Sequence, residues 1–171
     1  MTTDTINKTE ILKSLSESIS EMQQLISPLG TNEINTIPYD DSWTAAQLLS
    51  HVSKSINGMA KAMSAEGKPA ERDAGERIPE LKKTFLDFSK KMKSPDFIVP
   101  EKGPFEKGAM TEELNNSSEM FKESAEHATL TEAVEGLPLG PITKLEILHF
   151  VVYHTQRHMH QLKKICEAIK K

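Results

Sequence analysis

The sequence predicts an all-α protein, a four-helix bundle with an additional short helix and a long loop between the second and third core helices. Three observations support this fold class. Apolar residues recur every three or four positions in four long segments, which is the period of an amphipathic helix. No segment of any length alternates apolar and polar residues as a half-buried strand does. Aromatic residues make up only 5% of the 171 residues, which fits helices better than a β-sandwich.

The first two core helices are delimited by their end signals. The first is expected over about residues 7–27, because Pro28 and Gly30 then end it. The second begins near Thr44, since Thr44 and Gln47 form a capping-box pattern. The apolar stripe of the first helix consists of Leu12, Leu15, Ile19, Met22, Ile26 and Leu29. That of the second consists of Leu48, Val52, Ile56, Met59 and Met63.

The middle of the chain predicts the short helix and the loop. A proline suits a first helical turn, so the short helix is expected over residues 79–92. Residues 94–110 carry three prolines and two glycines and are expected to form a loop. The third core helix starts near Thr111 and ends before residue 136. Its inward residues are Leu114, either Met120 or Phe121, and Ala125.

The last helix has the clearest boundaries. Thr143 and Glu146 form a second capping-box pattern, and no helix breaker follows before about Ile169. At 1.5 Å per residue such a helix is roughly 40 Å long, which is enough to span a bundle.

Composition predicts one globular domain over residues 1–171. Hydrophobic residues make up 37% and charged residues 27%, and the net charge of −4 provides no basic face for nucleic acid. The single cysteine, Cys166, excludes an internal disulfide and fits a reducing compartment. The first residues lack the apolar region of a signal peptide, and no apolar run approaches the length of a membrane span. We therefore expect a cytoplasmic protein without membrane or nucleic-acid partners.

Three histidines are candidates for a metal site. On a helical wheel His154 and His158 share one edge of the inward arc, whereas His149 and His160 lie outward. Two imidazoles four residues apart can bind one cation, because their Cβ atoms lie about 6 Å apart. His51 is the candidate third ligand, since it lies at the edge of the apolar stripe of the second helix. Such pairs also arise by chance, so spacing alone leaves open that these histidines bind no metal.

Three neutral imidazoles would suit Zn²⁺ or Ni²⁺. They would also leave at least one coordination position open, which is typical of catalytic rather than structural sites. A water molecule in that position would have its pKa lowered towards neutrality.

Two segments resemble the signature segments of the DinB-like (DinB/YfiT) superfamily. In the first, SWTAAQLLSHV, Trp43 is followed eight residues later by His51. In the second, HFVVYHTQRHMHQL, the pattern H-x-x-x-H-x-x-Q is formed by His154, His158 and Gln161. The resemblance covers most of the chain. It implies a four-helix bundle, often a homodimer, in which three histidines hold a divalent metal ion, here His51, His154 and His158.

The resemblance leaves two hypotheses of function open. Some relatives are transferases or isomerases that use a low-molecular-weight thiol activated by the metal, and many have no assigned activity. The first hypothesis is thus a metal-dependent enzyme in which a water or a thiolate attacks a small molecule, by hydrolysis or thiol transfer. The alternative is a non-catalytic metal-binding or stress-associated protein. No Asp or Glu shares the edge with His154 and His158, so no general base is evident, which favours thiol chemistry.

Four other residues near the motifs have simpler interpretations. Trp43 is expected to serve packing, and Gln161 to orient a ligand, to contact the metal-bound water or to be solvated. Arg157 lies roughly opposite the apolar arc and is expected at the surface or an interface. Cys166 falls on the inward arc, where a thiol is usually inert.

We also expect a homodimer with two-fold symmetry. The resemblance implies it, and the loop over residues 94–110 provides a partial physical reason. A loop broken by prolines cannot bury all its apolar residues by regular helical packing. It either folds over its own bundle or leaves an apolar patch of the kind that marks interfaces. These apolar residues are Phe97, Ile98, Val99 and Phe105.

Overall fold

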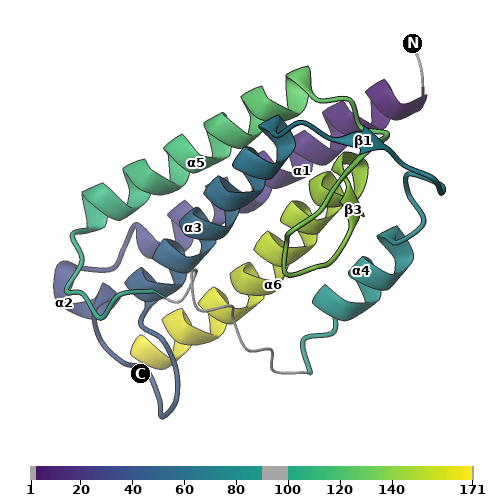
Figure 1. Cartoon of the computed structure of the whole chain (residues 1–171). Coiled ribbons are helices and arrows are strands. Elements are labelled where there is room, and N and C mark those ends of the chain that lie inside the picture. Colours follow the sequence, from purple (N-terminus) through teal and green to yellow (C-terminus); the bar gives the residue numbers. More distant parts are fainter. Residues whose placement is uncertain (1–2, 90–99, 171) are drawn as a thin grey trace.

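Four long helices form the body of the molecule and confirm the predicted fold class. They are α1 (Thr3–Ile26), α3 (Ala45–Ser64), α5 (Lys107–His127) and α6 (Lys144–Ile169). The computed structural model describes residues 3–89 and 100–170. Helices α1 and α6 run in one direction and helices α3 and α5 in the other (Figure 1). Helix α1 packs chiefly against α6 and α5, while α3 packs chiefly against α5 and α6. The two helices that carry the candidate histidines are therefore neighbours.

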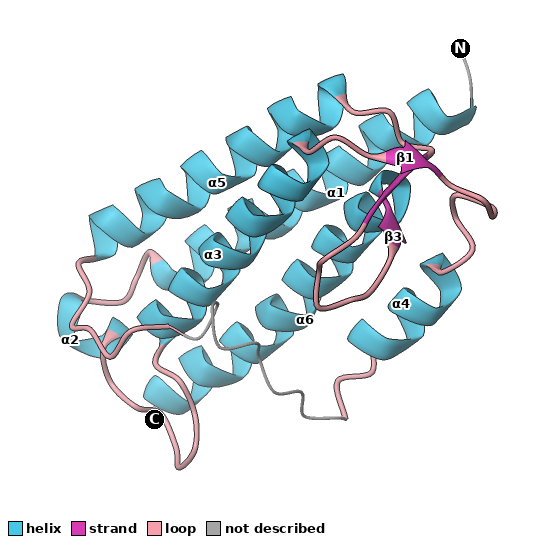
Figure 2. Ribbon diagram, in the orientation of Figure 1, coloured by secondary structure: helices cyan, strands magenta, loops and turns pink. Residues whose placement is uncertain are grey.

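Two short helices and a small sheet complete the fold (Figure 2). Helix α2 (Thr31–Ile34) follows α1, and helix α4 (Ile78–Phe85) packs against α6. The sheet has the order β1-β2-β3, with both pairs antiparallel. The strands are too short to give an alternating sequence pattern, so the sequence did not predict them. Because the sheet joins segments next to α3, α5 and α6, it fixes the ends of these helices to one another. The strands are β1 (Lys68–Pro69), β2 (Glu132–Val134) and β3 (Ile142–Thr143).

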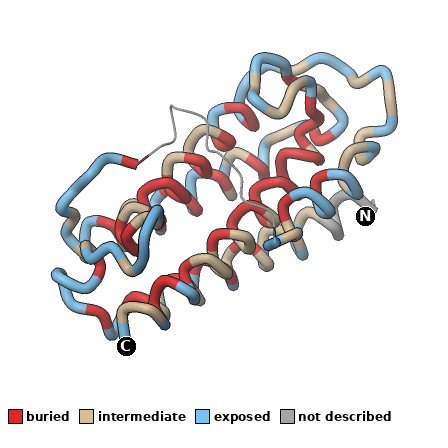
Figure 3. The backbone as a smooth tube through the Cα atoms, turned by 90° about the horizontal axis from the view of Figure 1, so that it is seen from below, coloured by how far each residue is buried: buried red, intermediate tan, exposed pale blue. Residues whose placement is uncertain are grey.

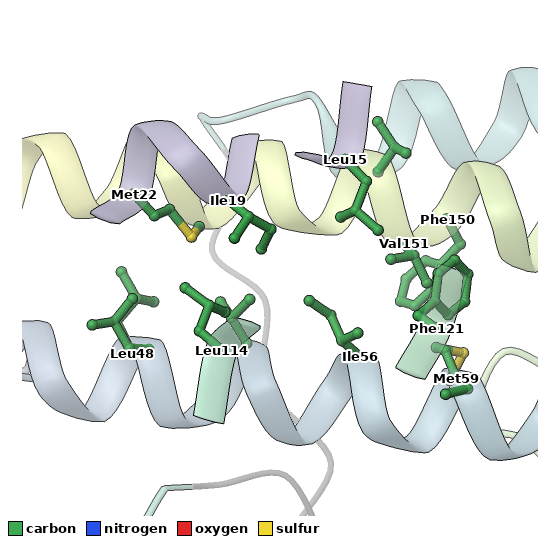
Figure 4. Packing of buried hydrophobic residues seen from close by; sticks show 14 of the residues in the cluster. Leu15, Ile19, Met22, Leu48, Ile56, Met59, Leu114, Phe121, Phe150 and Val151 are labelled. Atoms are coloured by element: carbon green, nitrogen blue, oxygen red, sulfur yellow. The ribbon is translucent and has the colours of Figure 1, made fainter. Parts of the chain in front are cut away.

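The core lies between the four long helices, where the buried side of each faces inward (Figure 3). Figure 4 shows the predicted apolar stripes meeting there, with Leu15 and Met22 of α1 opposite Leu48 and Ile56 of α3. Phe121 of α5 is completely buried, whereas its neighbour Met120 is 48% exposed. The alternative left open by the sequence is thereby decided in favour of Phe121.

Several predicted boundaries are wrong, and local hydrogen bonds explain the differences. Helix α4 ends at Phe85 rather than at residue 92, because the side chain of Asp87 accepts hydrogen bonds from the backbone N–H and the hydroxyl of Ser89, which forms a turn. Residues 90–92 lie outside the described residues. Helix α5 begins at Lys107 rather than near residue 111, because the carboxylate of Glu106 caps its first turn.

Both predicted capping boxes are present. At the start of α3, the hydroxyl of Thr44 accepts a hydrogen bond from the N–H of Gln47 (3.1 Å), and the side chain of Gln47 accepts one from the N–H of Thr44 (2.9 Å). At the start of α6, Thr143 and Glu146 form the same pair of bonds at 3.1 and 3.0 Å. These caps fix where the two helices begin, and with that the positions of the histidines along them.

Replacing the cap of α3 should give a measurable loss of stability. We expect Thr44→Ala to lower the free energy of unfolding by about 1 kcal/mol, since an N–H of the first turn loses its acceptor. Thr44→Ser keeps the hydroxyl and should stay within about 0.5 kcal/mol of the wild type. Urea denaturation followed by circular dichroism measures both. Equal losses in the two variants would mean that the cap hydrogen bond contributes nothing.

The predicted homodimer is untested by the structure of one chain. Phe97, Ile98 and Val99 lie outside the described residues. Phe105 is half-buried against the core, and its backbone N–H and C=O both bond the side chain of Asn35. We expect sedimentation equilibrium at micromolar concentration to give about twice the chain mass of 19.1 kDa. A mass equal to that of one chain would contradict the prediction.

None of the helices in the described residues combines the length and hydropathy that crossing a lipid bilayer requires.

Candidate metal centre

The three candidate histidines come together between α3 and α6. The Nε2 atom of His158 lies 3.0 Å from Nε2 of His51 and 3.2 Å from Nε2 of His154. One ring nitrogen from each of the three lies within 4.8 Å of the others. All three residues are buried, with exposed fractions of 1% for His51 and 8% for His154 and His158. The structure therefore brings together the residues that the sequence singled out.

The spacing of the nitrogens fits a tetrahedral metal ion. Zinc binds histidine nitrogen at about 2.0–2.1 Å, and tetrahedral geometry then separates two such nitrogens by about 3.3–3.4 Å. The observed separations of 3.0 and 3.2 Å are close to this value. The nitrogens of the third pair, His51 and His154, lie within 4.8 Å of one another. The residues present thus fit a divalent ion held by three imidazoles.

Burial keeps the two histidines of α6 neutral. Burial, reinforced by the nearby charge of His51, lowers the pKa of His158 to about 3. Burial also lowers the pKa of His154 well below its usual value, and the charges of His158 and His51 add to the effect. A neutral imidazole is the form that binds a cation. At neutral pH neither ring therefore has a net proton to release on binding metal.

Among the described residues, no carboxylate shares the centre. Over residues 3–89 and 100–170, no Asp, Glu or Cys joins the three histidines in a cluster that could hold a cation. A divalent ion bound by these three rings would therefore keep its two positive charges uncompensated by the protein ligands. An anionic fourth ligand would be strongly favoured in such a site.

Two polar side chains contact the outer nitrogens of the α6 histidines. The Nδ1 atom of His158 lies 2.9 Å from Oε1 of Gln161. The Nδ1 atom of His154 lies 3.4 Å from the hydroxyl oxygen of Ser55, one turn after His51 on α3. Of the roles left open for Gln161, this contact supports that of orienting the ring of His158. Ser55 lies one turn after His51 on α3, and its contact with His154 could not be predicted from the sequence because it depends on how α3 packs on α6.

Aromatic rings line two sides of the centre. The ring of Trp43 lies 4.8 Å from that of His51 and 6.4 Å from that of His158, between ring centroids. On the other side Phe150 lies 5.2 Å and Phe85 6.0 Å from the ring of His154. Trp43 packs as expected, but it packs on the histidines themselves. Apolar walls of this kind lower the local dielectric and strengthen electrostatic interactions at the centre.

The interpretation of Arg157 as a surface or interface residue needs correction. Its side chain is half-buried, and its guanidinium donates hydrogen bonds to the carbonyl oxygens of Phe85 (3.4 Å) and Asp87 (2.9 Å). These carbonyls lie at the C-terminal end of α4, where a cation is favoured. Arg157 thus attaches α4 to α6 between His154 and His158, a contact that the sequence could not predict because it depends on where α4 lies.

The remaining singled-out residues lie outside the cluster. His149 is half-buried, with its Nδ1 atom 3.4 Å from the hydroxyl of Tyr153, and the ring of His160 stacks on Phe88. Cys166 is buried as expected, and burial raises the pKa of its thiol, which keeps it protonated and inert.

Comparisons with known proteins agree with this fold and site. Structural similarity extends to YfiT from Bacillus subtilis, described as a probable metal-dependent hydrolase with an unusual four-helix bundle topology, at 16% identity and a TM-score of 0.65 over 98% of this chain and 89% of that one. A conserved protein from Enterococcus faecalis matches at 14% identity and a TM-score of 0.67 over 99% and 98%. No curated protein sequence matches significantly. The sequence model of the DinB superfamily matches residues 14–162, a span that includes all three clustered histidines, so the chain belongs to the DinB superfamily.

Proposed function

We propose that His51, His154 and His158 bind a divalent metal ion and that the protein is a metal-dependent enzyme acting on a small molecule. The observation that carries the proposal is the convergence of three buried ring nitrogens without a carboxylate among them. Zn²⁺ and Ni²⁺ are the ions that suit such a ligand set. When bound, the ion would supply Lewis acidity, which stabilises an anion such as a thiolate at neutral pH.

The residues around the centre support transfer of a low-molecular-weight thiol to an electrophile. The three histidines would hold the ion, and the apolar rings of Trp43, Phe85 and Phe150 pack against the histidine rings. Thiol chemistry needs no separate base once the thiol has lost its proton. Hydrolysis usually needs a positioned general base near the water, and the described residues place no carboxylate within the cluster.

Hydrolysis is the second candidate, and one observation favours it. YfiT, which shares the fold, is described as a probable metal-dependent hydrolase. A non-catalytic metal-binding or stress-associated protein is the third candidate and would require only the metal site. We further propose a cytoplasmic location, supported by the single buried cysteine.

Metal binding tests the first part of the proposal. Trp43 is the only tryptophan of the chain and lies beside His51. Titration of untagged, metal-free protein with Ni²⁺ should therefore quench its fluorescence with a stoichiometry of one ion per chain. Calorimetry with Zn²⁺ should give the same stoichiometry. Absence of saturable binding by both methods would refute the proposed site.

An activity screen distinguishes the three candidate functions. The zinc-loaded and nickel-loaded proteins are incubated with several low-molecular-weight thiols and electrophiles, and separately with esters and amides. We expect thiol-dependent consumption of an electrophile that disappears on addition of a chelator. Hydrolysis without thiol would favour the second candidate. Tight metal binding with no turnover in either screen would favour the non-catalytic one.

A further inference from the structure

The outer contacts of His154 and His158 differ in their chemistry. Gln161 presents a carbonyl oxygen to Nδ1 of His158, and a carbonyl oxygen can only accept a hydrogen bond. With the amide in this orientation Nδ1 of His158 carries the proton, and the Nε2 atom of the neutral ring holds a lone pair. Ser55 presents a hydroxyl to Nδ1 of His154, and a hydroxyl can either donate or accept.

The inner contacts place a second constraint on His154. The Nε2 atom of His158 lies 3.2 Å from Nε2 of His154 and 3.0 Å from Nε2 of His51, and ring nitrogens this close cannot both present lone pairs to one another without repulsion. With a lone pair on Nε2 of His158, the metal-free protein favours a proton on Nε2 of His154 and on Nε2 of His51. The Nδ1 atom of His154 is then an acceptor, and the hydroxyl of Ser55 can donate a hydrogen bond to it.

We propose that Gln161 and Ser55 are positioning residues with unequal roles. Gln161 fixes His158 in the tautomer that binds metal, whereas Ser55 can hydrogen-bond His154 in either tautomer. On metal binding the proton of the neutral His154 ring leaves Nε2, and Nδ1 takes one up by exchange with solvent, so the ring stays neutral. The hydroxyl of Ser55 then accepts from Nδ1. A serine in a helix can direct its own hydrogen to the carbonyl oxygen four residues earlier, which satisfies the hydroxyl in this second state.

The burial of the contacts supports this assignment. Ser55 is buried, and Gln161 is half-buried on the same helix as its histidine. The rings of His154 and His158 are themselves buried, so water cannot easily replace a partner at their Nδ1 atoms, and leaving a buried polar atom unpaired costs about 1–3 kcal/mol. The partners of the ligands thus determine which nitrogen faces the ion. His158 is the pre-formed ligand, and His154 is the one that changes tautomer.

Nitrogen-15 NMR tests the inference directly, and it rests on the proposed function only where metal is added. Long-range proton–nitrogen correlation spectra at pH 8 identify the protonated nitrogen of each ring, with His154→Gln and His158→Gln used for assignment. In the metal-free protein we expect the proton of His158 on Nδ1 and that of His154 on Nε2. After one equivalent of Zn²⁺, both rings should carry it on Nδ1.

Variants separate positioning from a merely structural role. Gln161→Leu should bring a proton to Nε2 of His158 and weaken Zn²⁺ affinity about 10–100-fold, whereas Gln161→Glu, which still accepts, should restore the Nδ1 tautomer. Ser55→Ala should weaken affinity about 10-fold. Its matched control is Ser53→Ala, since the buried hydroxyl of Ser53 has no hydrogen-bond partner among the described residues and its loss should leave affinity unchanged.

Three results would overturn the inference. One is a proton on Nε2 of His158 in the metal-free wild type, and another is a Gln161→Leu variant with an unchanged His158 tautomer. The third is a His154 ring that carries its proton on Nδ1 both before and after zinc is added. Failure of Zn²⁺ to bind would instead refute the proposed function, and the metal-free spectra would still decide the role of Gln161.

Discussion

Replacing His158 with alanine is expected to weaken Zn²⁺ binding by more than about 100-fold. Loss of a residue that only hydrogen-bonds a metal ligand weakens binding by about 10–100-fold, and loss of the ligand itself should weaken it further. His158 is the central member of the cluster, because its Nε2 atom lies within 3.2 Å of the Nε2 atoms of both other histidines. Without it only two rings remain, and neither can compensate from its buried position. Calorimetry with Zn²⁺ and quenching of Trp43 by Ni²⁺ measure the loss.

His160→Ala is the matched control. His160 lies two residues further on the same helix, but its ring stacks on Phe88 with centroids 4.3 Å apart and takes no part in the cluster. We expect its affinity for Zn²⁺ to stay within about threefold of the wild type, a difference of about 0.7 kcal/mol. Circular dichroism checks that both variants are folded. Equal losses in the two variants would place the metal elsewhere.

Arg72→Leu is expected to lower the free energy of unfolding by about 3 kcal/mol, because it leaves a buried carboxylate without its cation. The side chain of Glu146 is fully buried and accepts two hydrogen bonds from Arg72, at 2.7 and 2.8 Å. The side chain of Arg72 is 26% exposed, so water can partly replace it, which places the expected loss at the lower end of the range for buried pairs. Urea denaturation measures the change.

Two further variants identify the cause of that loss. Glu76 is the exposed partner of the same arginine, 3.5 Å away, and Glu76→Gln should cost less than about 0.5 kcal/mol. Adding Glu146→Gln to Arg72→Leu removes the stranded charge and should recover part of the stability. A double variant as unstable as the sum of the two single ones would show that the charge pair is not the cause.

The same carboxylate should make stability depend on acid pH. Burial alone would raise the pKa of Glu146, but hydrogen bonds from Arg72 and from the backbone N–H groups of Thr143 and Arg77 outweigh it and hold the pKa below 4.5. The unfolded chain therefore binds the proton first. The stabilising contribution is fully present above about pH 4.5 and is lost as the pH falls through the lower pKa of the folded state.

Denaturation at a series of pH values tests this dependence. The stability difference between the wild type and Glu146→Gln should shrink as the pH falls from 6 to 3. The glutamine variant cannot titrate at this position, so it serves as the reference at each pH. A difference that stays constant over this range would show that the carboxylate is not held in its charged form.

The four core helices could be predicted because their signals are local. The apolar stripe that includes Leu48 and Val52, and the caps at Thr44 and Thr143, depend on residues within a few positions of one another. The histidine pair of α6 is also a local signal, since a spacing of four residues places two rings on one helix face. The sheet was not predicted because its strands, such as the two that pair Val134 with Ile142, are too short to give an alternating pattern.

The sequence by itself indicated the apolar face of each long helix, with only the choice between Met120 and Phe121 left open, and it singled out the three histidines. Only the tertiary structure decided that α3 lies beside α6, which brings His51 to within 3.0 Å of His158. It also decided that Ser55 contacts His154 and that Arg157 binds the end of α4. The physical reason is that a helix face is set by periodicity along the chain, whereas the neighbour of that face is set by how all the helices pack together.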